Sequence, residues 1–245
     1  MEYYPIYLNL CRKKILVVGG GSVALRKTKR LLDAKAFVKV VAPLFHEGFE
    51  TIRSNENLVL NLKTFEEKDA LDVFLVFAAT DDRELNFIIS EFCETRGILC
   101  NIVDNPEKSG FIVPSCIKRG DLMLAVSTGG KSPALSRKLR KDLEKEFGDE
   151  YEIFLYFLGE IRNAILEKRR GNPENRDIFR EMVFGNLLSS IKNKDIEGIE
   201  TELRQILDSR DLAEGLMDKL LEEKNDYFFD VEKNSFLFLS RESDL

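Results

Sequence analysis

A glycine-rich turn offers the clearest site for chemistry in this chain of 245 residues. The apolar residues 15–18 lead directly into the sequence GGGSVA at 19–24, where a helical pattern begins. In this spacing Gly19 allows a tight turn, Gly21 lets the backbone approach a phosphate, and Ala24 lets the helix pack closely on a sheet. The start of the helix adds N–H groups that can bind an anion. The motif predicts a dinucleotide site, although glycine turns also close ordinary strand–helix units.

The acid that usually accompanies such a turn is missing. A standard NAD fingerprint places a carboxylate about 20 residues beyond the glycines, on the ribose hydroxyls. Here the second strand ends in Val-Val-Ala-Pro at 40–43. Adenosine contacts therefore fall to backbone and apolar groups around Pro43 and Leu44. Thr80, after the fourth apolar run, adds a hydroxyl to the same rim.

Asp104 is the candidate proton acceptor. It follows the apolar run 98–103, so its carboxylate is expected at the carboxyl edge of the sheet, close to the nicotinamide half of a dinucleotide. By position alone, a turn-forming aspartate before Asn-Pro at 105–106 deserves equal weight. One of the two acids that follow the preceding run, Asp81 or Asp82, is interpreted as the cap of the next helix.

A basic segment lies at residues 113–141, in a chain whose net charge is −6. Both a solvated helix face and an anion-binding surface explain such a segment, whereas the overall negative charge argues against general nucleic-acid binding. Ser132 is predicted to cap the helix that begins at Pro133. The basic residues are Lys118, Arg119, Lys131, Arg137, Lys138, Arg140 and Lys141, and the one acid is Asp121.

The elements that position these residues follow an α/β pattern. Helical periodicity over 22–34 and 82–96 separates apolar, β-branched runs, which predicts a parallel sheet. Right-handed crossovers then give a Rossmann-like doubly wound sheet, with its crevice at the carboxyl ends of the strands. The predicted strands cover 15–18, 37–41, 58–62, 73–79 and 98–103.

The remainder of the chain predicts two further parts. Residues 113–148 contain a short strand at 121–126 and a helix to about 147, too little to enclose a core of their own, so they should pack on the first domain or form a homodimer. The expected domains are 1–112 for nucleotide binding, 113–148 for dimerisation and substrate binding, and an α-helical domain at 149–245. Its predicted helices are 151–169, 174–190, 196–207 and 212–224, followed by a hairpin of 227–231 and 236–239.

Composition excludes several classes of protein. No apolar run reaches the roughly 18 residues that cross a bilayer, and no signal core follows the amino terminus, so we expect a cytoplasmic protein without a membrane partner. His46, the single histidine, is expected to be solvated rather than a metal ligand. The cysteines have no CxxC spacing and predict buried free thiols without a metal site. They are Cys11, Cys93, Cys100 and Cys116.

A series of motifs makes the chain resemble the precorrin-2 dehydrogenase family, including the amino-terminal module of bifunctional and trifunctional sirohaem synthases. The resemblance covers residues 4–147. In that family VxAP stands where other NAD proteins carry the second-strand acid, so the missing carboxylate fits the pattern. The motifs are PIYLNL, ILVVGGGSVALRK, VVAP, FAATDD, CNIVDNP, FIVPS and LAVSTGGKSPALSRKLR, in this order.

The resemblance implies NAD-dependent oxidation of precorrin-2 to sirohydrochlorin in sirohaem biosynthesis, with Asp104 as the central catalytic residue. The carboxylate arms of this tetrapyrrole substrate would give the basic segment a ligand. A polyanionic ligand nearby should also raise the pKa of Asp104 above its reference of about 3.9. The candidate cofactor residues are Gly19, Gly21, Ser22, Val23, Ala24, Pro43, Leu44 and Thr80. The candidate substrate residues are Ser127, Thr128, Gly129, Lys131, Ser132 and Arg137.

Three alternatives remain at the level of sequence. Some members of the family also insert iron into sirohydrochlorin, so this chain could be bifunctional. A chelatase that has lost dehydrogenation is disfavoured by the intact Gly19, Gly21 and Ala24. A non-catalytic nucleotide-sensing module would be expected to keep the second-strand acid. In some members of the family the hydroxyls that match Ser127 and Thr128 are regulatory phosphorylation sites, but the local sequence predicts that these two residues form a turn.

Overall fold

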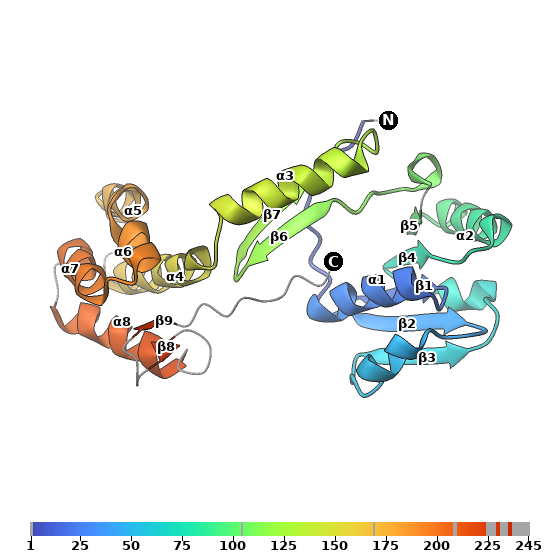
Figure 1. The fold of residues 1–245 in the computed structure, drawn as a ribbon, viewed down its shortest axis with the longest axis horizontal. Coiled ribbons are helices and arrows are strands. Elements are labelled where there is room, and N and C mark those ends of the chain that lie inside the picture. The colour runs from blue at the N-terminus through green and yellow to red at the C-terminus, as the bar shows by residue number, and fades with distance from the viewer. Residues whose placement is uncertain are drawn as a thin grey trace. The chain divides into compact units, whose positions relative to one another are not determined.

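The structure, a computed structural model, describes residues 2–103, 105–168, 170–207, 210–223, 229–230 and 235–236. The chain forms two compact units (Figure 1). The first comprises Met1–Val113 and Thr128–Ser132, and the second comprises Pro114–Ser127 and Pro133–Leu245. The short stretch Thr128–Ser132 therefore belongs with the first unit, although the chain on both sides of it belongs to the second.

A five-stranded parallel sheet forms the centre of the first unit, in the order β3-β2-β1-β4-β5. Strands β2 and β3 extend from one side of β1, and β4 and β5 extend from the other. The direction of winding thus reverses between β1 and β4, which confirms the predicted Rossmann-like doubly wound fold. The strands are β1 Lys14–Val18, β2 Phe37–Ala42, β3 Leu58–Leu62, β4 Leu75–Ala78 and β5 Leu99–Ile102.

Helices cover both faces of this sheet because its strands are apolar on both sides. In β1, Ile15 and Val17 pack in the core with α1, whereas Leu16 and Val18 pack with α2. All four side chains are at most 2% exposed. The covering elements are α1 Ser22–Asp33 and η1 Glu47–Ile52 on one face and α2 Arg83–Thr95 and η2 Glu67–Ala70 on the other, and η3 Pro106–Lys108 follows β5.

The prediction of buried thiols is right for Cys93 and Cys100 and wrong for Cys11 and Cys116, which are exposed. Cys11 lies in the turn before β1, and Cys116 points away from the face on which its neighbour Ile117 is buried. A hydrogen bond between the two buried thiols lowers the pKa of Cys93 and, together with burial, raises that of Cys100. All four cysteines are free.

The second unit begins with an antiparallel hairpin of β6 Ser115–Arg119 and β7 Leu122–Val126. The sequence predicted only the second of these strands. Gly120 turns between them with a φ of +55°. Helix α3, Pro133–Glu146, packs against the hairpin and begins at the predicted proline.

Further helices enclose a separate apolar core, in which Phe157, Ile161 and Leu203 are fully buried. The single helix predicted over 174–190 is wrong. It is broken at Gly185, whose backbone is extended and where a Cβ would lie 2.8 Å from the carbonyl oxygen of Glu181. The helices are α4 Glu150–Lys168, α5 Asn175–Phe184, α6 Leu187–Asn193, α7 Ile196–Leu207 and α8 Arg210–Glu223.

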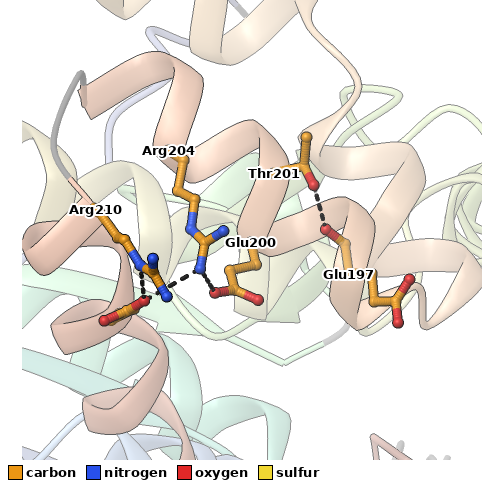
Figure 2. A network of polar contacts seen from close by, with 6 residues as sticks. Glu197, Glu200, Thr201, Arg204 and Arg210 are labelled. Atoms are coloured by element: carbon orange, nitrogen blue, oxygen red, sulfur yellow. Dashed lines mark hydrogen bonds and ion pairs between the residues drawn. The ribbon is translucent and has the colours of Figure 1, made fainter.

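A network of surface ion pairs involves α7 and α8 (Figure 2). Arg204 of α7 binds Glu200 on its own helix and reaches Glu214 of α8 at 3.1 Å. Arg210 donates to Glu214 at 2.6 Å. These contacts hold the pKa of Glu214 below its usual value. Of these three contacts, the one between Arg204 and Glu214 links α7 to α8.

Of the predicted carboxyl-terminal hairpin, the structure describes β8 Phe229–Asp230 paired antiparallel with β9 Ser235–Phe236. The rest of that prediction falls outside the described residues. Within the described part of the chain, no helix is both long and apolar enough to cross a bilayer.

Candidate active site

The glycine turn brings the ends of β1 and β4 together. Gly19 has a φ of +124°, and a Cβ there would overlap the carbonyl oxygen of Ala79 and lie 3.1 Å from the amide nitrogen of Thr80. The Gly19 N–H donates to Val41 of β2 at 2.9 Å. The predicted need for glycine at this position is confirmed, because both the backbone angle and the close approach exclude a side chain.

Gly20 is equally constrained, which the sequence reasoning missed. A Cβ at Gly20 would collide with the carbonyl oxygen of Leu44 and lie 2.9 Å from the Cβ of Ala42. The carbonyl of Gly20 accepts the N–H of His46 at 2.7 Å. The segment after β2 therefore lies directly on the glycine turn. In the sequence, the only signal for this contact was that glycine also occupies position 20, which the GxGxxA motif leaves open.

The amino end of α1 has the properties of an anion site. Gly21 occupies the N-cap without any side-chain cap, and the first turn contains no acid. A Cβ on Gly21 would have no neighbour within 4 Å, so open space lies beside this backbone. Ser22 is exposed and Val23 half-buried, whereas Ala24 is fully buried against the sheet. Uncapped N–H groups, open space and the absence of a competing acid fit the pyrophosphate of NAD.

The end of β2 presents an apolar surface where most NAD proteins carry an acid. Pro43 is exposed and the Leu44 side chain is 79% exposed, directly after the buried Ala42. An exposed leucine on the rim of a nucleotide site can cover the face of an adenine.

Thr80 is held in place by a buried asparagine. Its hydroxyl donates to Oδ1 of Asn86 at 2.8 Å, and Nδ2 of Asn86 donates to the Thr80 carbonyl at 2.9 Å. Asn86 is 4% exposed and was not singled out from the sequence. Asp82 caps α2 through the N–H groups of Glu84 and Leu85, as predicted.

Asp104 itself lies outside the described residues, but the backbone on both sides of it is described. The Val103 N–H donates to Ala78 of β4 at 2.9 Å. The hydroxyl of Ser109 accepts the Ile102 N–H at 2.9 Å and donates to the Asn105 carbonyl at 2.8 Å. Ser109 is 8% exposed, and nothing in the sequence marked it as important. A single buried hydroxyl thus joins the residues that flank position 104.

Lys27 of α1 reaches β5 and β4 with its side chain. Its Nζ lies 3.3 Å from Oδ1 of Asn101 and 4.7 Å from the ring centre of Phe77. Asn101 in turn donates to the carbonyl of Phe111 at 3.0 Å. This cluster connects α1 to β4, β5 and the chain that leaves β5.

The turn Thr128–Ser132 lies against the loop after β5. A Cβ on Gly130 would be 3.6 Å from Cγ of Pro106. The Thr128 hydroxyl closes the turn, at 3.1 Å from both the N–H and the carbonyl of Ser132. Gly129 and Gly130 have positive φ angles, as the predicted turn requires.

The other candidate substrate residues divide between the units. Lys131 is exposed within the first unit, whereas Ser127 and Arg137 are exposed residues of the second. The structure therefore brings four of the six candidates together, namely Thr128, Gly129, Lys131 and Ser132.

Acids neutralise part of the basic segment. Arg119 pairs with Asp149 at 3.0 Å, Lys138 pairs with Asp142 at 2.6 Å, and Arg140 pairs with Glu144. The hydrogen bond from Lys138 lowers the pKa of Asp142. Among the described residues, the basic side chains of this segment without an ion pair are Lys118, Lys131, Arg137 and Lys141. In the part of the chain that the structure describes, no cluster of three histidine, cysteine or acidic residues could hold a metal.

Comparison with known proteins identifies the family. The NAD(P)-binding family model matches residues 6–115, and the model of the central domain of sirohaem biosynthesis proteins matches 119–146. The siroheme synthase of Citrobacter koseri is 38% identical over 210 residues, which cover 84% of this chain and 46% of that protein. Siroheme synthase 2 of Pectobacterium atrosepticum is 36% identical over 213 residues, covering 86% and 46%.

A solved structure agrees with these matches. SirC, a precorrin-2 dehydrogenase, superimposes with a TM-score of 0.68 at 27% identity, covering 84% of this chain and 100% of SirC. This chain belongs to the precorrin-2 dehydrogenase and siroheme synthase family. It spans less than half the length of the siroheme synthases that it matches. The match to the NAD(P)-binding family model covers most of its first unit.

Proposed function

We propose that this chain is a precorrin-2 dehydrogenase, which oxidises precorrin-2 to sirohydrochlorin with NAD as the hydride acceptor. The close approach of Gly130 to Pro106 carries the proposal, because it brings the centre of the STGGKSP motif beside the loop beyond β5, on the same sheet as the glycine turn. The predicted nucleotide site and the centre of this motif, Thr128–Ser132, thus belong to one unit.

The proposed chemistry uses few residues of the protein. The substrate loses a hydride and a proton as its conjugation extends, and NAD supplies the hydride acceptor when bound. Asp104 accepts the proton, and the rest of the site positions the macrocycle. The exposed ammonium of Lys131, in the Thr128–Ser132 turn, binds its carboxylate arms through charge-assisted hydrogen bonds, and Arg137 is a separate candidate on the second unit.

The decisive test is anaerobic incubation of the purified protein with precorrin-2 and NAD, following the formation of NADH. We expect the wild type to form NADH and Asp104→Asn to lose roughly 100-fold or more in kcat, because an amide does not accept the proton. The variant should bind NAD as the wild type does.

A wild-type protein that binds NAD but forms no NADH would contradict the dehydrogenase proposal. Adding ferrous iron to the sirohydrochlorin product tests the alternative in which the same chain also acts as a ferrochelatase. A metallated macrocycle that forms faster with the protein than without it would establish that second activity.

We further propose a homodimer, which the surface of the second unit supports. Leu135 and Leu139, one turn apart on α3, are 45% and 38% exposed, and Met123 of β7 is 44% exposed. Exposed apolar side chains that gather on one element commonly mark an interface. A cytoplasmic location also remains a proposal, supported by the four free thiols.

A further inference from the structure

His46 connects the glycine turn to the element that follows β2. Its backbone N–H donates to the carbonyl of Gly20 at 2.7 Å. Its imidazole Nδ1 accepts the N–H of Gly48 at 3.0 Å and so caps the first turn of η1. One residue therefore contacts the nucleotide turn through its backbone and η1 through its side chain.

The surroundings leave little freedom for this connection to shift. A Cβ on Gly48 would lie 2.5 Å from Cδ2 of Leu25 on α1 and 3.1 Å from Nδ1 of His46, so η1 is packed closely on both. The ring of Phe49 is 1% exposed and lies 5.2 Å from the ring of Phe45 in an edge-to-face contact. Because η1 is anchored in the core through Phe49, the hydrogen bond from the Gly48 N–H to Nδ1 of His46 fixes the position of residue 46 relative to the core.

We propose that His46 is a positioning residue of the nucleotide site. Its imidazole, as a hydrogen-bond acceptor, holds residues 43–46 against Gly20 and so fixes the place of Leu44, whose carbonyl lies on the same glycine. The inference rests on the proposed function in one respect, namely that NAD binds at this turn. It gives the only histidine of the chain a role that is neither metal binding nor proton transfer.

The test separates the acceptor atom of His46 from its ring. His46→Asn keeps an oxygen that can cap Gly48, since asparagine is among the best N-cap residues. His46→Phe keeps an aromatic ring and lacks the acceptor. We expect His46→Phe to weaken NAD binding about five-fold or more and His46→Asn to remain within about two-fold of the wild type. Calorimetric titration with NAD alone measures both, so the result does not depend on the dehydrogenase reaction.

Thr51→Val provides the matched control, because the Thr51 hydroxyl donates to the Gly48 carbonyl at 2.8 Å within the same short helix. This variant loosens η1 without removing the acceptor on residue 46, and we expect NAD to bind it normally. Equal losses in Thr51→Val and His46→Phe would overturn the proposal, as would an unchanged affinity in His46→Phe. A wild-type protein that binds no NAD would overturn both this inference and the proposed function, whereas NAD binding without turnover would overturn only the latter.

Discussion

Gly20 and Gly21 are neighbours with opposite surroundings, and this contrast makes a matched pair of variants. In Gly20→Ala the new Cβ meets the Leu44 carbonyl, so the backbone must move. We expect an unfolding free energy lower by about 1–3 kcal/mol and at least ten-fold weaker NAD binding. In Gly21→Ala the Cβ enters open space, and stability should be unchanged while NAD binding weakens as strongly.

Thermal denaturation and NAD titration of the two glycine variants check this pair. Normal NAD binding by Gly21→Ala would show that the phosphates do not approach this backbone. The sequence predicted the tight turn at Gly19 and the close packing of Ala24 because the local spacing of the turn dictates them, whereas the approach of a phosphate to Gly21 stays a prediction. Gly20 and Asn86 could not be predicted, because their partners are more distant in sequence and are brought close only by the fold.

At the scale of elements, the carboxyl end of β5 depends on the hydroxyl of Ser109, which accepts a hydrogen bond from the Ile102 N–H. In Ser109→Ala the buried Ile102 N–H loses its acceptor, which costs about 1–3 kcal/mol of stability. The connection to Asn105 is lost as well. Because these residues flank Asp104, we expect kcat for the proposed oxidation to fall about ten-fold or more, with the affinity for NAD preserved.

Ser90→Ala is the control for Ser109→Ala. Ser90 is also a buried serine, and it donates to the Lys108 carbonyl at 2.9 Å, on the same loop but further from position 104. It should lose stability without a comparable loss in kcat. Steady-state kinetics and urea unfolding of the two variants distinguish them, and equal kcat values in both would refute a specific role for Ser109.

Elements with a strong internal period were predictable from the sequence, and those that depend on a partner were not. All five strands of the sheet and both of its long helices follow the apolar spacing. Strand β6 was missed because its alternation includes Cys116 and Lys118 and resembles a polar linker. The interruption at Gly185 was missed because the helical pattern resumes on the other side of it.

At the scale of the whole molecule, the chain enters the second unit at Pro114 and returns to the first unit for Thr128–Ser132. Residues 128–132 join the first unit through the contact at Pro106, which no local pattern encodes. The remaining question of assembly concerns the second unit. Leu135 and Leu139 are spaced by four residues, so they share one face of α3 and can be changed together.

We expect the wild type to sediment as a dimer and the double variant Leu135→Glu, Leu139→Glu to sediment as a monomer. In a symmetric interface each substitution occurs twice, so four carboxylates would be placed in an apolar contact, and the dimer dissociation constant should rise roughly 100-fold or more. Phe184→Glu is the control, since Phe184 is 79% exposed at the end of α5 on a different surface element. Sedimentation velocity over a range of concentrations decides the matter. A monomeric wild type, or a double variant that still dimerises normally, would exclude this face of α3 as the interface.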